Sequence, residues 1–294
     1  MNSVKTRGVL TQTLAYLTAI SVAIIVGKQL PAEMHPFWVI AIADIAATFV
    51  IFGFSVAVNN SSMYDPYWSV KPMVIAAYLG FVAYETTGEV DIRSWLVIGL
   101  SWYYGIRLTY NFLRGWPGLV HEDWRYADFR TQFPKTYWLV SLSGVHLFPT
   151  VMVYLGCLPM YPAMLDAVNS FGALDILAAI VTFGAVTIEL VSDEQMRDFA
   201  KTKKKGDIMD KGLWAYSAHP NYFGEIMFWW GLVIFAIAAN PAYWWTAIGA
   251  FAITVMFIFA SIPMLDKRSL ERRPGYQEYL DRTSNLIPWP KKSA

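Results

Sequence analysis

The chain has 294 residues, of which 56% are hydrophobic and only 15% carry a charge. Soluble domains average about 25% charged residues, so this composition excludes a soluble globular protein. The formal net charge of +1 gives no information about nucleic acid, but no nucleic-acid-binding motif accompanies the basic residues, so no nucleic-acid partner is expected. The single cysteine, Cys157, excludes an intrachain disulfide.

The apolar runs predict an all-α, polytopic membrane helix bundle with short helices in its loops, because a membrane-spanning helix needs about 20 mostly apolar residues. The first run is long enough to span and lacks a cleavage site, so we interpret it as a retained helix rather than a signal peptide. With no internal repeat or linker, a single domain should cover residues 1–294. The third and seventh runs are short, so seven spans are an alternative to eight. The expected spans are 10–29, 36–57, 73–88, 94–113, 138–158, 172–191, 223–239 and 243–264.

The basic residues predict the orientation of these spans. Of the 23 Lys and Arg residues, only Lys28 and Arg93 fall in loops on one side, and Arg107 lies within a span. The others gather in the second, fourth and sixth loops and at both chain ends. Because cytoplasmic loops are enriched in Lys and Arg, both termini are expected to be cytoplasmic.

Three ionisable residues fall inside the second, third and fifth spans, namely Asp44, Glu85 and His146. Ionisable groups are costly inside a bilayer and are usually paired or functional. The sequence leaves both interpretations open: structural polar contacts, or a path for protons.

A polar stripe marks the fourth span. Tyr104, Arg107 and Asn111 recur at helical spacing, so they share one helix face that leads to Arg114 at the cytoplasmic end. Such a stripe is unfavourable against lipid, and it therefore predicts a cavity or an interhelical contact.

Two further helix faces carry polar groups at the same membrane surface. Glu189, Asp193 and Arg197 are spaced four apart in the sixth helix. An ion-pair ladder explains Asp193 with Arg197, but it explains Glu189 less well, since this residue lies one turn deeper. Asn221 and Glu225 are also four apart at the start of the seventh span, where a carboxylate favours the helix N-terminus.

Two cytoplasmic segments complete this group. Asp65 precedes Pro66 in the second loop, and it is either a turn residue or a carboxyl that faces the mouth of a cavity. The charged C-terminal tail contains Tyr276, Tyr279 and Trp289, which a free tail would not need, so we expect it to fold back on the domain.

These polar residues predict an enzyme with a cytoplasmic cofactor site and an apolar substrate pocket between helices. The chain has neither a GxGxxG nor a GxxxxGK motif, so we expect neither a Rossmann dinucleotide site nor a P-loop. It also lacks HExxH, a cysteine pair and a GxSxG elbow, so neither a metal site nor a serine nucleophile is expected.

The stretch GLWAYSAHPNYFGE, followed by an aromatic-rich span and a tail ending YLDRTSNLIPWPKK, resembles the steroid 5-alpha-reductase family in its bacterial branch. The resemblance covers 59–294, whereas 1–58 would add two N-terminal membrane helices. HPNYFGE is shared with isoprenylcysteine methyltransferases and sterol C14 reductases, while SDEQM and LIPWP narrow the match toward the reductase. The resemblance implies an integral protein of a bacterial cell membrane.

The implied reaction is NADPH-dependent reduction of the 4,5 double bond of a 3-oxo-4-ene steroid or a similar enone lipid. Hydride would reach C5, a proton would reach C4, and a donor would stabilise the charge that develops on the C3 oxygen. Family matching places the catalytic carboxyl at Asp65, where the family has glutamate, and the phenol at Tyr104, with Tyr103 as the alternative.

The same matching assigns contacts with NADPH. Asn221 and Glu225 would lie near the nicotinamide ribose and carboxamide, and the residues around Asp193 near the adenosine and pyrophosphate. The run 201–205 and Lys211 are alternative partners for the 2'-phosphate. The full set of expected cofactor contacts is Asn221, Glu225, Asp193, Arg197, Glu189, Arg107, Asn111, Arg114, Tyr222, His219, Arg268 and Arg272.

Three other functions are compatible with the same residues. A lipid or isoprenylcysteine-type methyltransferase that uses S-adenosylmethionine, or a sterol C14-type reductase, would share HPNYFGE. A transporter would instead depend on Asp44, Glu85 and His146. No obligatory protein partner and no nucleic acid is expected; the expected partners are the lipid substrate and the membrane itself.

Overall fold

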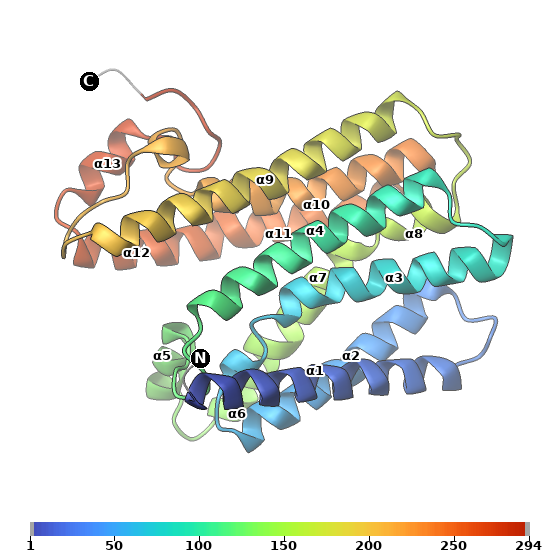
Figure 1. Cartoon of the computed structure of the whole chain (residues 1–294), viewed down its shortest axis with the longest axis horizontal. Helices are drawn as coiled ribbons and strands as arrows, with labels where there is room; N and C mark the ends of the chain where they lie inside the picture. The colour runs from blue at the N-terminus through green and yellow to red at the C-terminus, as the bar shows by residue number, and fades with distance from the viewer. Residues whose placement is uncertain (1–2, 292–294) are drawn as a thin grey trace.

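The computed structural model describes residues 3–291, and these residues form a bundle of long helices without a β-strand (Figure 1). The predicted all-α architecture is therefore confirmed. The longer helices are α1 (Ser3–Gln29), α2 (Pro36–Ala57), α3 (Tyr67–Thr87), α4 (Ile92–Gly115), α9 (Ala173–Thr202) and α10 (Pro220–Ala239). The shorter ones are α5 (Trp124–Gln132), α6 (Tyr137–Val140), α7 (Phe148–Cys157), α8 (Met160–Leu165), α11 (Ile248–Met256), α12 (Ile262–Arg272) and α13 (Tyr276–Arg282).

Short segments of 3₁₀-helix and π-helix connect these elements. They are the 3₁₀ turns η1 (Ser61–Met63), η3 (Gly212–Ala215) and η4 (Pro241–Ala247) and the π turns η2 (Ser141–Leu147) and η5 (Phe257–Ser261). Each π turn is followed by a proline, Pro149 or Pro263, in the first turn of the next helix. Proline lacks the N–H that would continue the α-helical ladder, which accounts for the local widening of the helix.

Within the described residues, 6 helical stretches are long and apolar enough to cross a membrane. They are Ser3–Gln29, Pro36–Ala57, Tyr137–Leu165, Ala173–Thr202, Pro220–Ala239 and Pro241–Arg272. The expected spans 73–88 and 94–113 are the helices α3 and α4, which run along the others in Figure 1. They fall outside this apolar set, and each carries a buried basic residue, Lys71 in α3 and Arg107 in α4.

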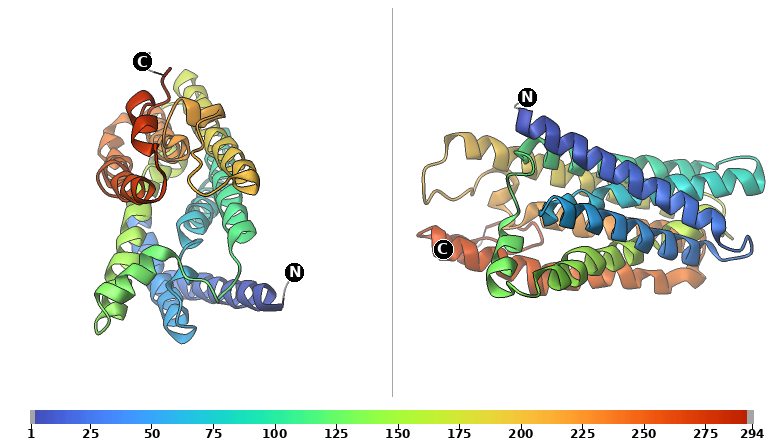
Figure 2. Two further views of the ribbon diagram at one scale, coloured as in Figure 1. Left: turned by 90° about the vertical axis from the view of Figure 1, so that its left-hand side faces the viewer. Right: turned by 90° about the horizontal axis from the view of Figure 1, so that it is seen from below.

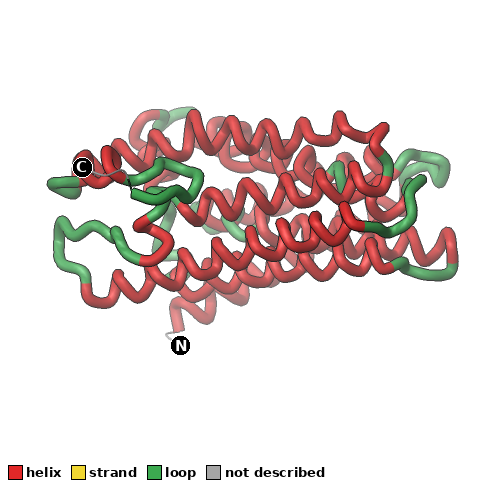
Figure 3. Tube along the Cα trace, turned by 90° about the horizontal axis from the view of Figure 1, so that it is seen from above, coloured by secondary structure: helices red, strands yellow, loops and turns green. Residues whose placement is uncertain are grey.

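The loops collect at the two ends of the bundle (Figure 3). Helix α1 begins at the end where α5, α12 and α13 lie (Figure 1), and Figure 2 shows α1 at the periphery beside α2. At the opposite end, Arg93 donates from Nε to Asp175 Oδ1 over 2.6 Å and from a terminal nitrogen to Oδ2 over 3.0 Å. Both side chains are buried, so this bidentate pair joins the start of α4 to the start of α9.

Glycines bring two pairs of helices into backbone contact. On α10, a Cβ atom at Gly231 would lie 2.1 Å from Thr182 Oγ1 of α9, and one at Gly224 would lie 2.6 Å from the Ala185 carbonyl oxygen. On α4, a Cβ at Gly105 would lie 2.6 Å from the Ser69 carbonyl oxygen of α3. Small residues of this kind allow membrane helices to approach closely, so α9–α10 and α3–α4 each form a tight pair.

Candidate active site between α3, α4, α9 and α10

The centre of the candidate site is the carboxyl group of Glu225, in the second turn of α10. Its Oε1 accepts hydrogen bonds from Tyr104 Oη at 2.7 Å, Trp68 Nε1 at 2.8 Å and Trp229 Nε1 at 2.9 Å. Tyr104 and Trp229 are fully buried and Glu225 is 5% exposed. Three donors converge on this one oxygen, so the carboxyl group is held in a fixed position inside the bundle.

The phenol of Tyr104 has a fixed position. Its ring stacks on Phe228 with a centroid separation of 3.9 Å and an interplanar angle of 8°, and its edge meets Trp229. Tyr103, one residue earlier, stacks instead on Phe183 and lies 3.4 Å from Thr187 Oγ1, on the outer side of α9. Among the two tyrosines considered from sequence, Tyr104 is therefore the one that enters the site.

The predicted stripe on α4 faces the predicted ladder on α9. Arg107 donates to Asp193 Oδ2 over 2.9 Å and forms an ion pair with Glu189, and Asn111 donates to Asp193 over 2.9 Å. Arg197 in turn donates to the Asn111 side-chain oxygen. The stripe is thus an interhelical contact. It begins one helical turn after Tyr104 and leads away from the Glu225 centre toward the end of the bundle.

Several buried polar atoms in this contact have no hydrogen-bond partner within the described part of the chain. They are the Nε atoms of Arg107, Arg114 and Arg197 and the Oε2 atom of Glu189. Arg114 also pairs with Glu194, a residue that the sequence reasoning did not single out. Unpartnered buried donors are costly, so a cluster of them indicates a place built to bind a polar ligand.

The start of α10 supplies three of the predicted cofactor residues, the N-cap residue His219 and, in the first turn, Asn221 and Tyr222. Asn221 is half-buried, and among residues 3–291 its side chain makes no hydrogen bond. His219, before Pro220, lies 2.9 Å from Asp266 Oδ1 and stacks on Tyr222 with a centroid separation of 5.6 Å. His219 therefore ties α10 to α12, whereas Asn221 keeps its amide available.

The predicted pairing of Asp65 with Tyr104 is not what the structure shows. Asp65 accepts a hydrogen bond from Tyr126 Oη of α5 at 2.6 Å, and the partner of Tyr104 is Glu225. Burial raises the pKa of the Asp65 carboxyl to about 7, although the Tyr126 hydrogen bond opposes this shift. Asp65 belongs to the loop between α2 and α3, which is held by α5 at the end of the bundle.

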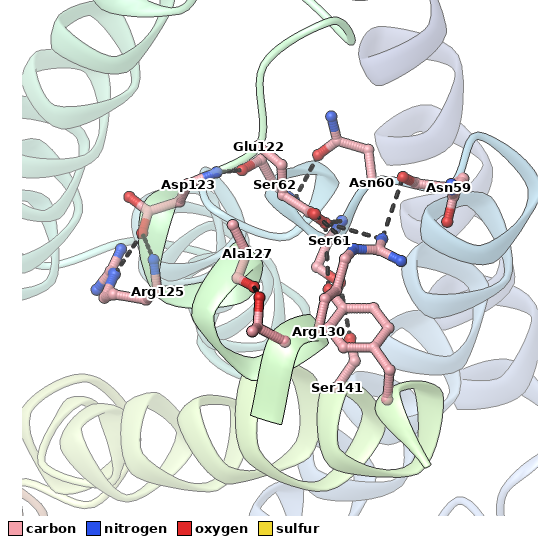
Figure 4. Close-up of polar contacts among 12 residues, drawn as sticks. Asn59, Asn60, Ser61, Ser62, Glu122, Asp123, Arg125, Ala127, Arg130 and Ser141 are labelled. Atoms are coloured by element: carbon pink, nitrogen blue, oxygen red, sulfur yellow. Dashed lines mark hydrogen bonds and ion pairs between the residues drawn. The ribbon is translucent and has the colours of Figure 1, made fainter. Parts of the chain in front are cut away.

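A polar network fixes that loop, as Figure 4 shows. Glu122 accepts from the backbone N–H of Ser61 at 2.7 Å and from Arg130 Nε at 2.6 Å, and Ser62 Oγ accepts from the Asp123 backbone N–H at 2.9 Å. These contacts make the region around Asp65 a structural junction between the second loop and α5.

The C-terminal tail folds back, as the aromatic residues predicted. The Ser284 carbonyl accepts from the Ala218 N–H at 2.8 Å, and Tyr279 Oη donates to the Trp214 carbonyl over 2.7 Å. The tail thereby supports the segment that leads into α10. Arg268 stacks on Trp124 of α5 with a separation of 3.8 Å, and Arg272 is exposed, so neither of them touches the Glu225 centre.

The three ionisable residues of the second, third and fifth spans do not form one cluster. Asp44 forms a buried ion pair with Lys71, which sequence reasoning missed because it placed the third span from residue 73 onward. His146 contacts Ser55 Oγ at 3.0 Å, and Glu85 is exposed near the end of α3. Trp68 was missed for the same reason as Lys71, since α3 begins at Tyr67.

The sequence of this chain is similar to those of known proteins. The profile of the family described as "Protein of unknown function (DUF1295)" matches residues 51–283. An uncharacterized protein of the fission yeast Schizosaccharomyces pombe is 27% identical, over 86% of this chain and 80% of its own length. No solved structure gives a significant match. The family match covers the candidate site, from Asp65 through Tyr104 to Glu225.

Proposed function

Because the chain belongs to the DUF1295 family, which is part of the steroid 5-alpha-reductase-like superfamily, we propose that it is an NADPH-dependent reductase. Its substrate would be a 3-oxo-4-ene steroid or a similar enone lipid, reduced at the 4,5 double bond. The observation that carries the proposal is the buried hydrogen bond from Tyr104 to Glu225, with Trp68 and Trp229 on the same carboxyl oxygen.

The role of Tyr104 is to donate a hydrogen bond to the ketone oxygen of the enone. Negative charge develops on that oxygen when hydride reaches C5, and a positioned O–H donor stabilises it. Tyr104 donates to Glu225 in the structure, so its proton would have to change partner when the ketone approaches. The two tryptophan N–H groups would keep the Glu225 carboxylate hydrogen-bonded during that change.

This assignment moves the carboxyl partner of the phenol from Asp65 to Glu225. Asp65 is satisfied by Tyr126 and lies in the α5 junction, so we give it a supporting role. Tyr104 keeps the role that the family resemblance implies.

The residues around Glu225 fit NADPH chemically. The unpartnered guanidinium nitrogens of Arg107, Arg114 and Arg197 suit phosphate oxygens, and the carboxylate of Glu189 suits ribose hydroxyls. The free amide of Asn221 suits the carboxamide or ribose near the nicotinamide. When bound, the reduced nicotinamide supplies the hydride. The end of the bundle holds Arg268, Arg272 and the basic run 201–205. These residues would contact the cofactor only if its 2'-phosphate extended that far.

We also propose that both termini are cytoplasmic and that the protein lies in a bacterial cell membrane, because the basic residues gather at the end of the bundle where α1 begins. Reporter fusions at each terminus test this orientation. A terminus that reports an external location would contradict it.

The decisive experiment supplies the purified protein with androstenedione and NADPH deuterated at the transferable nicotinamide position. We expect deuterium at C5 of the product by mass spectrometry. Tyr104→Phe should lower turnover about 100-fold or more, since a positioned donor contributes about 10²–10³ in rate. Tyr103→Phe is the matched control and should retain turnover, because its hydroxyl points toward Thr187.

The methyltransferase alternative is tested in the same preparation with radiolabelled S-adenosylmethionine and lipid extract. Methyl transfer without NADPH oxidation would overturn the proposed function. Deuterium transfer to C14 of a sterol diene, with none to the 4-ene steroid, would instead favour the sterol C14-type reaction.

A further inference from the structure

A cavity lies on the other side of α3 and α4 from the candidate active site. Its volume is about 930 Å³, within the range of roughly 300–1,000 Å³ of ligand pockets. Helices α1, α2, α3 and α4 line it, and its α4 residues are Trp102 and Ile106, whereas Tyr104 and Arg107 face away. No lining residue belongs to the Glu225 centre, so the cavity is a separate site.

The cavity is long and open to the side of the bundle. Along α1 its lining extends from Tyr16 to Lys28, which corresponds to about 18 Å at 1.5 Å per residue. The lining side chains Phe81, Ile106 and Ile24 are 61%, 56% and 53% exposed, and they lie on helices of a membrane bundle. The opening therefore faces the lipid, and its apolar walls suit a hydrocarbon body.

Apart from Lys28 at the end of the lining along α1, a buried polar feature interrupts these walls. Asp44 and Lys71 form an ion pair with side-chain exposures of 7% and 3%, and Tyr67 Oη donates to Asp44 over 2.9 Å. Lys71 also donates to the Thr150 carbonyl. An ammonium has three donors, so among the described residues Asp44 and Thr150 leave one N–H of Lys71, which lines the cavity and whose Nζ also lies 5.9 Å from the centre of the Tyr154 ring.

The charge of this feature limits the ligand. Asp44 and Lys71 neutralise each other, and Lys28 lies at the end of the lining along α1, so an anionic or zwitterionic headgroup placed beside the buried pair would have no counter-charge there and would lose its hydration. A hydroxyl or ketone oxygen needs only a donor such as Lys71, because the hydroxyl of Tyr67 already donates to Asp44. We propose that this cavity binds a neutral lipid with one such oxygen, taken from the surrounding membrane. The proposal is independent of the proposed reductase function.

Two photoreactive probes test the proposal on the full chain in nanodiscs: a diazirine-bearing sterol and a diazirine-bearing long-chain alcohol. Adducts of at least one probe should map to α1, α2 or α3. Ala23→Phe and Ala43→Phe fill the cavity and should lower adduct yield at least tenfold. Ala57→Phe makes the same change at the exposed end of α2 and should leave the yield unchanged. The thermal midpoint of each variant verifies folding.

A paired variant separates polar anchoring from simple partitioning. Asp44→Leu with Lys71→Met removes both charges together, a replacement that buried ion pairs often tolerate. It should lower capture of the oxygen-bearing probe, while a hydrocarbon diazirine without oxygen is captured as before. Unchanged adducts in both phenylalanine variants would overturn the proposal. Equal competition by a phospholipid would do so too, as would a Phe variant that converts a dimer to a monomer, which would assign the cavity to a second copy.

Discussion

The substitution Glu225→Ala should destabilise the protein far more than the loss of any one of its hydrogen-bond donors. It removes the acceptor shared by Tyr104, Trp68 and Trp229 and leaves three donors inside the bundle without a partner. Each buried donor without an acceptor costs about 1–3 kcal/mol, so the total is roughly 3–9 kcal/mol. Whole-protein stabilities are about 5–15 kcal/mol, so this loss is severe.

Tyr104→Phe provides the comparison, because it removes one donor and leaves Glu225 with two. Its cost should be about 0.5–1.5 kcal/mol. At about 2 °C per kcal/mol for a long chain, the midpoints should fall by about 6–18 °C for Glu225→Ala and about 1–3 °C for Tyr104→Phe. The assay is the loss of monodisperse protein on size exclusion after heating in one detergent. If both variants lost equal stability, Glu225 would not be the shared acceptor.

Three further predictions concern other parts of the molecule. Arg93→Met strands the buried Asp175 carboxylate and should cost about 3–5 kcal/mol in thermal unfolding; adding Asp175→Asn should recover much of it. The raised pKa of Asp65, about 7, means that the folded state holds this proton more tightly than the unfolded state. Wild type should therefore lose thermal stability relative to Asp65→Asn as pH rises from about 5 to about 8; a constant difference would contradict the pKa shift. Gly231→Ala should lower the midpoint by several degrees, because its Cβ would overlap Thr182; Gly53→Ala, where a Cβ meets nothing within 4 Å, is the matched control and should have little effect.

Local periodicity explains what the sequence predicted well. The spacing of three and then four residues between Tyr104, Arg107 and Asn111 placed them on one face of α4, and the four-residue spacing of Glu189 and Asp193 gave the facing surface of α9. Because a helix face is a property of a few turns, these two surfaces were visible without knowledge of the packing. That they would meet each other was an inference from polarity, since lipid excludes both.

Residues whose partners come from distant segments were harder to predict. Lys71 lay outside the expected third span because hydropathy places a helix by its apolar residues, whereas α3 begins at Tyr67 and buries Lys71 in its second turn. Glu225 receives donors from α3, α4 and its own helix, an arrangement that depends on how the helices tilt. Asp65 was assigned from the family's spacing, but α5 takes its carboxyl.

The glycine contacts join four core helices into two tightly packed pairs, α9 with α10 and α3 with α4. Gly224 and Gly231 allow α10 to pack closely on α9, and Gly105 allows α4 to pack closely on α3. If one helix of a pair slid along the other, atoms at these contacts would overlap. The Glu225 carboxylate belongs to the α9–α10 pair, and the hydroxyl of Tyr104 belongs to the α3–α4 pair. A molecule that reaches this carboxylate would therefore have to separate the two helix pairs. The ion pairs of Arg107 with α9 would be the contacts that break.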